Sequence, residues 1–383
     1  MNAPAPDVEA LMRRAIALAR LGEGFVHPNP LVGAVLVKNG DIIGEGYHME
    51  VGRPHAEINA IAAARAAGHD VAGATMVVTL EPCAHFGRTP PCVEALVAAG
   101  IAHVYLGMID PNPRVSGRGI GYLRENGVGV TERVLERECA AINTAFVKYI
   151  TTRRPYVIIK AAMTLDGKIA TRTGASRWIS SAESLRYAHE LRRTNQAILV
   201  GAGTVHHDDP QLTCRLEGVR VRHPVRIVVD GRLSIREDAR VVSGGLPGVT
   251  VIATTAASDE AKRRRLADAG CEVLMLPGAD GKIDFRDLMN ALGEMKVASL
   301  MIEGGATMLA AALDADVVDR IHLVVAPKIF GGRDAPSVIG GRGVDEVADA
   351  WRLVDVKVSR LGDDVLIEGD VRRGEIAPDV TGP

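Results

Sequence analysis

One imidazole, one carboxylate and two thiols stand in an order that strongly limits how this chain can fold. His55 and Glu57 lie in a Pro-His-Ala-Glu segment, Cys83 lies in a Glu-Pro-Cys segment, and Cys92 follows nine residues later. Taken singly, each has an ordinary explanation, because histidines and cysteines are common in protein cores. Together, His55, Cys83 and Cys92 supply three zinc ligands and leave a fourth position open, as in a catalytic site. The fold must therefore bring these three segments together.

The carboxylate beside the first ligand indicates the chemistry. In zinc-dependent deaminases His and Cys hold the ion, and a Glu that is not a ligand acts as general acid and base. Zinc lowers the pKa of a bound water to about 7, and Glu57 would move protons to a ring nitrogen and to departing ammonia. The pattern predicts hydrolytic removal of an exocyclic amine from a heterocycle. Eight residues rather than two separate the thiols, so residues 84–91 must form a loop that returns Cys92 to the metal.

Length and charge limit the other possibilities. A chain of 383 residues exceeds the usual size of one hydrophobic core, so we expect two domains. Its 45 Lys and Arg against 47 Asp and Glu give a net charge of -2, which argues against a polynucleotide substrate. No apolar run is long enough for a membrane span or a signal core. We therefore expect a cytoplasmic protein with no nucleic-acid or membrane partner.

Five cysteines, an odd number in a chain of this length, do not indicate a disulfide framework. Two of them are assigned to the metal. Cys139, Cys214 and Cys271 are expected to be buried or incidental thiols.

Alternating strands and helices predict an α/β fold in both halves. We expect one domain over residues 1–150, a second over 151–374, and a disordered tail over 375–383. His55 and Glu57 would open one helix, Cys83 would follow a strand, and Cys92 would open another helix, where the dipole favours a thiolate. Predicted helices cover 7–21, 56–67, 91–99, 182–193, 259–269, 285–292 and 306–313, and predicted strands cover 31–37, 41–46, 75–79, 103–108, 156–160, 197–200, 225–230, 250–253, 272–276, 299–303, 320–325 and 365–371.

Glu303-Gly304-Gly305 marks a turn between a predicted strand and a predicted helix in the second half. Glycine lets the backbone approach a ligand closely, and a helix N-terminus attracts phosphate. Glycine pairs after strands also occur without a ligand, so this turn leaves phosphate binding open. Gly201-Ala202-Gly203 lacks the third glycine of a dinucleotide fingerprint, so it does not indicate a standard Rossmann fold.

Many short motifs occur in the order in which one known family has them. The first half contains His27-Pro28-Asn29-Pro30-Leu31-Val32-Gly33, His55-Ala56-Glu57, Glu81-Pro82-Cys83, Thr89-Pro90-Pro91-Cys92 and Asp110-Pro111-Asn112-Pro113. The second half contains Lys160, Thr164-Leu165-Asp166-Gly167-Lys168, Ser176-Arg177-Trp178-Ile179-Ser180, Gly203-Thr204-Val205, Asp208-Asp209-Pro210-Gln211-Leu212-Thr213 and Glu303-Gly304-Gly305. From residue 8 to about residue 371 the chain resembles the bifunctional riboflavin-biosynthesis deaminase/reductases.

This resemblance implies a cytidine-deaminase-like three-layer domain followed by a dihydrofolate-reductase-like α/β domain. It implies one zinc ion in the first domain and NADPH in the second. The first domain would deaminate 2,5-diamino-6-(5-phosphoribosylamino)pyrimidin-4-one to 5-amino-6-(5-phosphoribosylamino)uracil. The second would then reduce the ribose of that product to a ribityl chain.

The resemblance also implies roles for individual residues of the first domain. His55, Cys83 and Cys92 match the zinc ligands, and Glu57 matches the proton shuttle. The eight-residue insert between the thiols is the family's own pattern. Substrate contacts are implied for Asn29, His85 and Arg88, of which Arg88 stands where many relatives have Lys; either cation can bind a phosphate.

In the second domain the resemblance implies two sets of contacts. Substrate contacts fall on Ser176, Arg192, Leu212, Arg215 and Glu303, where two arginines can hold a ribose phosphate while a carboxylate orients sugar hydroxyls. Cofactor contacts fall on Met163, Trp178, Thr204, Asp208, Ser234, Gly305, Ala306, Thr307, Met308, Leu309, Ala310 and Ala311. Trp178 also has the alternative of a core aromatic, and His206 and His207 are interpreted as surface residues.

Two other functions are compatible with parts of the sequence. The first domain alone would allow a nucleic-acid or tRNA base deaminase, but the charge and the second half argue against it. A zinc-stabilised binding protein with a degenerate site would not need Glu57. We also expect a homo-oligomer formed through the second domain.

Overall fold

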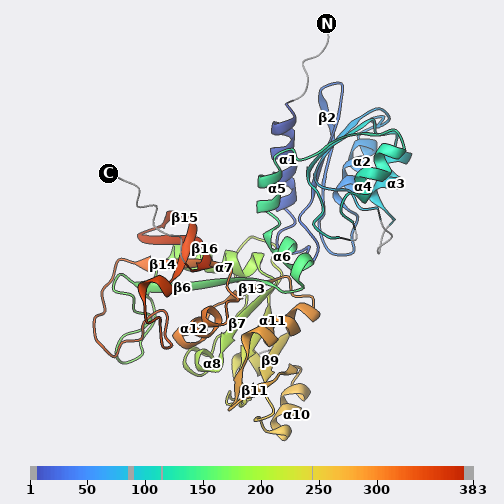
Figure 1. Ribbon diagram of the computed structural model, residues 1–383. Coiled ribbons are helices and arrows are strands. Elements are labelled where there is room, and N and C mark those ends of the chain that lie inside the picture. The colour runs from blue at the N-terminus through green and yellow to red at the C-terminus, as the bar shows by residue number, and fades with distance from the viewer. Residues whose placement is uncertain (1–6, 85–89, 114, 244, 375–383) are drawn as a thin grey trace, which may run out of the picture. The chain divides into compact units, whose positions relative to one another are not determined.

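The computed structural model describes residues 7–84, 90–113, 115–243 and 245–374. The chain folds into two compact units, Met1–Arg153 and Arg154–Pro383, each built around its own sheet (Figure 1). Both units are α/β, as the sequence predicts. The expected tail, residues 375–383, lies outside the described residues.

The first unit contains a five-stranded sheet in the order β2-β1-β3-β4-β5. β1 pairs antiparallel with β2 and β3, and β3, β4 and β5 run parallel. The strands are β1 (Gly33–Lys38), β2 (Asp41–Tyr47), β3 (Thr75–Leu80), β4 (His103–Met108) and β5 (Gly129–Thr131), and the helices are α1 (Val8–Arg20), α2 (Ala56–Ala66), α3 (Cys92–Ala98), α4 (Arg118–Glu125), α5 (Glu136–Ala141) and α6 (Thr144–Thr152).

Helices cover both faces of this sheet and make three layers. A side chain at Gly33 of β1 would collide with the main chain of α1, whereas one at Gly44 or Gly46 of β2 would collide with the main chain of α2. Because alternate strand residues point to opposite faces, and Gly46 pairs with Ala34 rather than Gly33, α1 and α2 lie on opposite sides. The glycines thus let both helices pack closely.

The second unit contains a nine-stranded sheet in the order β10-β9-β8-β7-β13-β6-β14-β16-β15. The strands from β10 to β14 in this order are parallel, and β16 and β15 add an antiparallel edge. The strands are β6 (Tyr156–Thr164), β7 (Ala197–Gly201), β8 (Val225–Val229), β9 (Thr250–Thr254), β10 (Glu272–Met275), β13 (Ser299–Ile302), β14 (Arg320–Ala326), β15 (Trp351–Leu361) and β16 (Asp364–Arg373), beside a small hairpin of β11 (Gly278–Ala279) and β12 (Lys282–Ile283).

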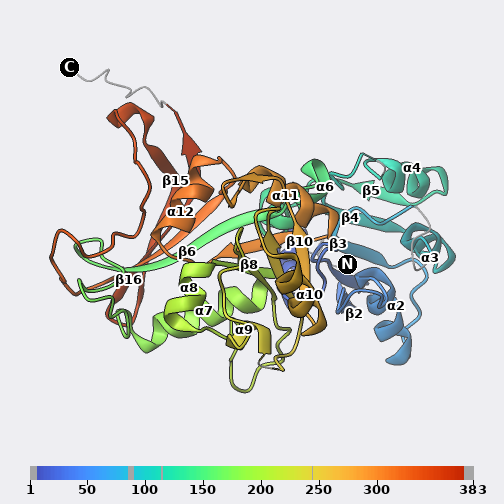
Figure 2. The same ribbon diagram turned by 90° about the horizontal axis from the view of Figure 1, so that it is seen from below.

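Two apolar cores cover the two faces of this sheet, and Figure 2 shows helices on both sides of it. One core joins the strands to α11 (Phe285–Glu294) and α12 (Ala306–Asp314), and the other joins them to α7 (Ala182–Thr194), α8 (Ala202–Asp208) and α10 (Glu260–Asp268). Ile159 and its neighbour Ile158 illustrate the alternation, since they belong to different cores. The carboxyl ends of β7, β13 and β6 therefore meet between two layers of helices.

Several elements were absent from the sequence prediction. It did not contain α4, α5, α6, α8, the short α9 (Arg240–Ser243), β5, the β11–β12 hairpin or β15. Most of these are short, and β15 is largely solvent-exposed, so it lacks the apolar pattern of a buried strand. Among the described residues no helix is long and apolar enough to cross a membrane.

Candidate active sites

The first candidate site lies at the N-terminus of α2. His55 is the capping residue of this helix, with extended backbone, and Glu57 lies in its first turn. Cys83 follows the end of β3, and Cys92 is the first residue of α3. The main-chain N–H of Cys92 donates to the sulfur of Cys83 at 3.4 Å, which brings the two ends of the intervening loop together.

The three predicted ligands form a compact donor set. One ligand atom from each of His55, Cys83 and Cys92 can be chosen so that all lie within 4.8 Å of one another. His55 Nδ1 is 3.2 Å from Cys92 Sγ and 3.6 Å from Cys83 Sγ. Zinc bonds of about 2.1 Å to nitrogen and about 2.3 Å to sulfur, at tetrahedral angles, separate such ligands by about 3.6 Å. The residues therefore fit a zinc ion with three protein ligands.

Hydrogen bonds within this set influence the ionisation of the thiols. The bond to Cys92, assisted by the bond to His55, lowers the pKa of Cys83 to about 4. The same contact between the thiols, together with burial, raises the pKa of Cys92. A thiolate at Cys83 is thus favoured, and thiolate is the form of cysteine that binds a metal.

Glu57 is the buried acid of this site. Its side chain is 3% exposed, and its Oε2 atom has no hydrogen-bond partner within the described part of the chain. Burial, and to a smaller extent the neighbouring Cys83, raises the pKa of Glu57. A buried carboxyl group whose pKa is raised can hold and release a proton, as an acid–base catalyst must.

Asn29 is oriented by a histidine that the sequence analysis did not select. His48, 3% exposed, has Nδ1 3.3 Å from the carbonyl oxygen of Pro54 and Nε2 3.1 Å from Asn29 Nδ2. A carbonyl oxygen only accepts, so Nδ1 carries the proton and Nε2 accepts from the Asn29 amide. The amide oxygen of Asn29 takes no part in this contact. His85 and Arg88, predicted to contact substrate, lie outside the described residues.

The second candidate site lies at the carboxyl ends of β7 and β13, which are parallel neighbours. Gly201 ends β7 before α8, and Gly305 precedes α12. A side chain at Gly201 would collide with Met308, and one at Gly305 would approach the hydroxyl of Thr204. The two glycine turns therefore pack together. Gly305, the capping residue of α12, makes no side-chain cap hydrogen bond, and main-chain N–H groups at a helix N-terminus attract phosphate.

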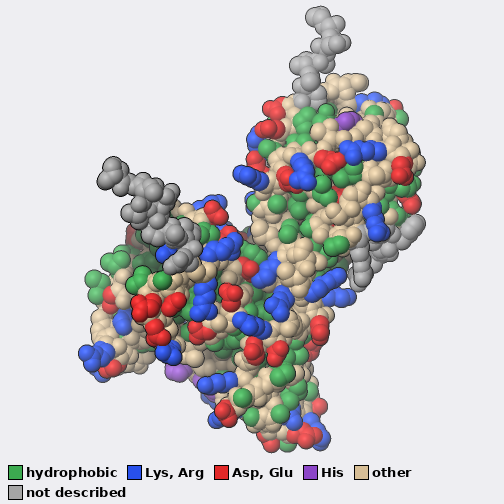
Figure 3. Space-filling model, viewed as in Figure 1, with side chains coloured by type: hydrophobic (Ala, Val, Ile, Leu, Met, Phe, Trp, Pro, Cys, Tyr) green, Lys and Arg blue, Asp and Glu red, His purple; other side chains and the backbone are tan. Residues whose placement is uncertain are grey.

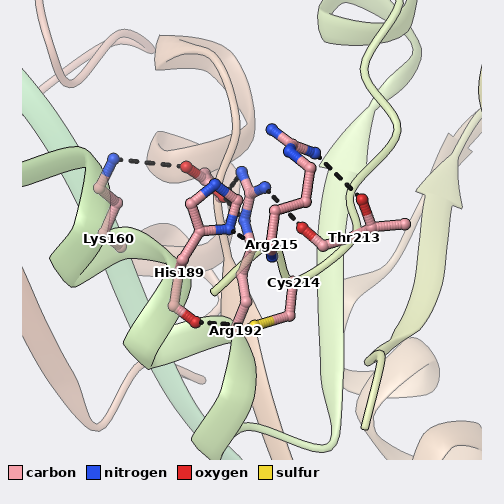
Figure 4. Close-up of polar contacts among 7 residues, drawn as sticks. Lys160, His189, Arg192, Thr213, Cys214 and Arg215 are labelled. Carbon is pink, nitrogen blue, oxygen red and sulfur yellow. Dashed lines mark hydrogen bonds and ion pairs between the residues drawn. The ribbon is translucent and has the colours of Figure 1, made fainter. Parts of the chain in front are cut away.

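An ion-pair cluster adjoins these turns (Figure 4). Glu303, just after β13, accepts from Lys160 of β6 at 3.3 Å through Oε1 and from Arg192 of α7 at 2.7 Å through Oε2. Burial would raise the pKa of Glu303, but the charges of Arg192 and Lys160 outweigh it and hold the pKa at about 2. Lys160 is 8% exposed and belongs to the family motifs, but the sequence predicts no role for it. The signal that could have indicated one is a lysine at the end of a predicted apolar strand.

Arg215 lies beside this cluster on the segment after Leu212, which is buried and has φ 55°. The guanidinium of Arg215 donates to Thr213 Oγ1 at 3.0 Å, and that of Arg192 donates to Thr213 O at 3.2 Å. Both arginines therefore contact the same residue, one through its hydroxyl and the other through its main-chain oxygen. Figure 4 also shows His189, which no sequence pattern selected.

The other predicted residues of this unit lie at varied depths. Arg177 donates to the main-chain oxygen of Asp208 at 3.0 Å, which connects the segment of Ser176 and Trp178 to the end of α8. Trp178 is 67% exposed, so the alternative of a core aromatic is wrong. Ser234 donates to Asp230, and His206 and His207 are exposed, as predicted. Leu309 and Ala310 are buried, whereas Met163, Ala306, Thr307, Met308 and Ala311 are at least partly accessible.

Comparison with known families and proteins covers both units. Residues 6–108 match the family model "Cytidine and deoxycytidylate deaminase zinc-binding region", and residues 155–367 match "RibD C-terminal domain". The riboflavin biosynthesis protein RibD of Actinobacillus pleuropneumoniae is 44% identical over 93% of this chain and 93% of its own length. That of Escherichia coli is 38% identical over 94% of this chain and 98% of its own length.

Solved structures also match both units of this chain. RibD of Acinetobacter baumannii superimposes with a TM-score of 0.85 at 33% identity, covering 95% of this chain and 99% of the other. A Thermotoga maritima diaminohydroxyphosphoribosylaminopyrimidine deaminase/5-amino-6-(5-phosphoribosylamino)uracil reductase superimposes with a TM-score of 0.82 at 39% identity, covering 96% and 98%. The fold class predicted for both halves is confirmed.

Proposed function

This chain belongs to the RibD family of riboflavin biosynthesis proteins and is a bifunctional deaminase and reductase, and we propose which of its residues carry each reaction. It removes ammonia from 2,5-diamino-6-(5-phosphoribosylamino)pyrimidin-4-one and reduces the ribose of the resulting uracil with NADPH. Its cofactors are zinc and NADPH. We assign the deamination to Met1–Arg153 and the reduction to Arg154–Pro383.

In the deaminase unit, His55, Cys83 and Cys92 would hold the zinc ion. When bound, zinc lowers the pKa of a water to about 7 and so provides a nucleophile at neutral pH. Glu57 would take one proton from that nucleophile and deliver it to the ring nitrogen, and it would then pass a second proton, from the added hydroxyl group, to the amine that leaves as ammonia. The support for this role is the buried Oε2 atom of Glu57 beside the proposed ligands, which has no hydrogen-bond partner among the residues that the structure describes.

Asn29 would fix the orientation of the pyrimidine through its amide oxygen, because His48 occupies one N–H of the amide. Groups that carry an N–H, such as a ring amine, are the partners that such an oxygen accepts from. His85 and Arg88 are proposed to bind the substrate phosphate on the resemblance alone.

In the reductase unit, Arg192 and Arg215 would bind the ribose phosphate, with Ser176 and Leu212 lining the same region, and Glu303 would orient sugar hydroxyls. The paired glycine turns and the N-terminus of α12 support a cofactor site beside them. When bound, NADPH would supply the hydride that reduces the anomeric carbon of the ring-opened sugar. That reduction also consumes a proton, so a proton donor is needed. The donor proposed is Lys160, whose Nζ atom lies 3.3 Å from Glu303 Oε1 at the same site.

The cluster of His55, Cys83 and Cys92 next to buried Glu57, joined in one chain to the Glu303 cluster, is the observation that carries this proposal. A split assay tests it: purified zinc-loaded protein is given the phosphoribosylated diaminopyrimidine, and ammonia is followed before NADPH is added. We expect ammonia release first and NADPH oxidation second. Oxidation of NADPH before any ammonia is released would contradict the proposed order of the two reactions. If no ammonia is released at all, the proposed substrate is wrong.

The alternative of a polynucleotide deaminase finds no support on the face of the molecule that Figure 3 shows. On the face seen in Figure 3, Lys and Arg are intermixed with Asp and Glu over both units, and no continuous basic track is visible there. Tracking a phosphate backbone requires such a basic stripe. A small phosphoribosylated pyrimidine is the substrate class that fits.

We also propose that two copies associate through the reductase unit. β15 is an edge strand of 11 residues, and its Val356 and Val358 are 50% and 66% exposed. A long edge strand with exposed valines offers unpaired main-chain groups to a second strand.

All five cysteines are free thiols, which agrees with a reducing compartment such as the cytoplasm.

A further inference from the structure

His189 links α7 to the segment that carries Arg215. The main-chain N–H of Arg215 donates to His189 Nδ1 at 3.2 Å, and the thiol of Cys214 donates to the main-chain oxygen of His189 at 3.3 Å. The same residue of α7 therefore contacts two successive residues of this segment through its ring and through its main chain. Figure 4 shows the ring of His189 next to Arg192 and Arg215.

The direction of the first hydrogen bond determines the tautomer of this ring. A main-chain N–H can only donate, so His189 Nδ1 must accept and carries no proton, which leaves the proton of the neutral ring on Nε2. A protonated ring would have two N–H groups, and one of them would face the N–H of Arg215. The contact with the main-chain N–H of Arg215 therefore requires the neutral form of His189.

The surrounding charges act in the same direction. Burial, followed by the positive charges of Arg192 and Arg215, lowers the pKa of His189 to about 4. Lys160, Arg192 and Arg215 are cations and Glu303 is the one anion among the residues of this cluster, which leaves an excess of two positive charges while His189 is neutral. This excess matches a phosphate monoester, which carries nearly two negative charges at pH 7.

We propose that His189 is a positioning residue of the reductase: its Nδ1 atom holds the main chain of Arg215 where the guanidinium can bind the substrate phosphate. The inference rests on the proposed function, because it takes the phosphate of the reductase substrate as the ligand of Arg215. Arg192 needs no such support, since it projects from α7 itself and is held by Glu303. Arg215 projects from an irregular segment, so its position depends on what holds that segment.

Three substitutions of His189 separate this role from a direct contact with substrate. In His189→Asn the amide oxygen lies near the place of Nδ1 and can still accept from Arg215. In His189→Gln the amide lies near the place of Nε2, so a donor to the substrate remains but the acceptor for Arg215 is lost. His189→Ala removes both groups.

The first measurement is NADPH oxidation with the phosphorylated uracil substrate and with its dephosphorylated analogue. We expect His189→Ala and His189→Gln to raise KM for the phosphorylated substrate about tenfold, equivalent to about 1.4 kcal/mol, with kcat within about twofold. His189→Asn should stay close to the wild type, and no variant should change KM for the analogue. Rescue by Gln but not Asn, an equal rise for both substrates, or no rise at all would overturn the proposal.

The second measurement does not depend on turnover. Nitrogen NMR of the histidine rings in the full chain, with His189 assigned by comparison with His189→Asn, should show a neutral ring with its proton on Nε2 at pH 6. A proton on Nδ1, or a charged ring at that pH, would refute the link to Arg215. If the wild type fails to oxidise NADPH with this substrate, the proposed function is wrong, and the NMR result still decides whether His189 holds Arg215.

Discussion

Arg192 and Glu303 are joined by two hydrogen bonds that end on the same carboxylate oxygen, from Nε at 3.0 Å and from Nη2 at 2.7 Å. The other oxygen of Glu303 accepts from Lys160. One carboxylate therefore connects α7, β6 and the end of β13. Both cations are largely buried, so each depends on Glu303 for compensation of its charge.

Glu303→Gln should weaken both the second unit and the reductase. The amide removes the negative charge from two partly buried cations, which we expect to cost about 2 kcal/mol of unfolding free energy. Both tryptophans of the chain, Trp178 and Trp351, lie in the second unit, so tryptophan fluorescence during denaturation reports the unfolding of that unit. Ammonia release by the first unit serves as the control and should not change.

The difference in stability between the wild type and Glu303→Gln should become smaller as the pH falls. The folded-state pKa of Glu303, about 2, lies below its ordinary value of 4.5, so its stabilising effect is present in full above about pH 4.5. It is lost as the pH falls from there toward 2. The denaturation midpoints of the wild type and of Glu303→Gln should therefore converge below pH 4.5. A difference that stays constant from pH 7 to pH 3 would show that the charge of Glu303 is not responsible.

Glu57→Gln should retain zinc and lose deamination. Gln has nearly the shape of Glu but cannot carry a proton between nucleophile and leaving group, so ammonia release should fall by about 100-fold or more. Zinc content, measured by metal analysis, should match the wild type. NADPH oxidation with the already deaminated substrate should also be unchanged, and an active variant would remove Glu57 from the mechanism.

Cys83→Ser should release zinc and abolish ammonia production together. Its sulfur lies 3.6 Å from His55 Nδ1 in the donor set, and a serine hydroxyl is not deprotonated at neutral pH as a thiolate ligand must be. Cys271→Ala, in the second unit, is the matched control for loss of a buried thiol and should keep its zinc. Full zinc occupancy in Cys83→Ser would contradict the ligand assignment.

Arg215→Ala should raise KM of the reductase for its phosphorylated substrate about 10- to 100-fold, because hydrogen bonds to a charged group contribute about 1.5–3 kcal/mol. The guanidinium makes one described side-chain bond, to Thr213, so its removal should disturb the fold little. Arg222→Ala, an exposed arginine further along the same segment, is the matched control. An unchanged KM would exclude Arg215 from the site.

The sequence was most informative where few residue types can do the chemistry. The zinc donors were selected because imidazole and thiols at helix starts and strand ends indicate a metal. It was least informative where tertiary contacts assign the role. His48 acts on Asn29, and His189 acts on Arg215, 26 residues away in sequence. Neither histidine stands in a local pattern, because the groups that fix its tautomer come from other elements.

Glu81 leads to the last prediction. This carboxylate is 3% exposed and accepts four main-chain hydrogen bonds: from Asp110 and Gly117 to Oε2, at 3.2 and 3.1 Å, and from Gly119 and Ile120 to Oε1, at 2.9 and 3.3 Å. It thereby ties the end of β3 to the start of α4. Cys83 is two residues further on, so the position of this proposed zinc ligand should depend on the same anchor.

Glu81→Gln turns one accepting oxygen into an NH2 group that faces main-chain N–H donors, and the anchored segment must then shift. We expect zinc to bind on the order of tenfold more weakly, measured by competition with a chelator, and ammonia release at limiting zinc to fall in parallel. Saturating zinc should restore much of that activity, which a defect in proton transfer would not allow. Glu94→Gln, an exposed carboxylate of α3, is the control and should bind zinc as the wild type does. Unaltered zinc affinity in Glu81→Gln would show that Cys83 is held without it.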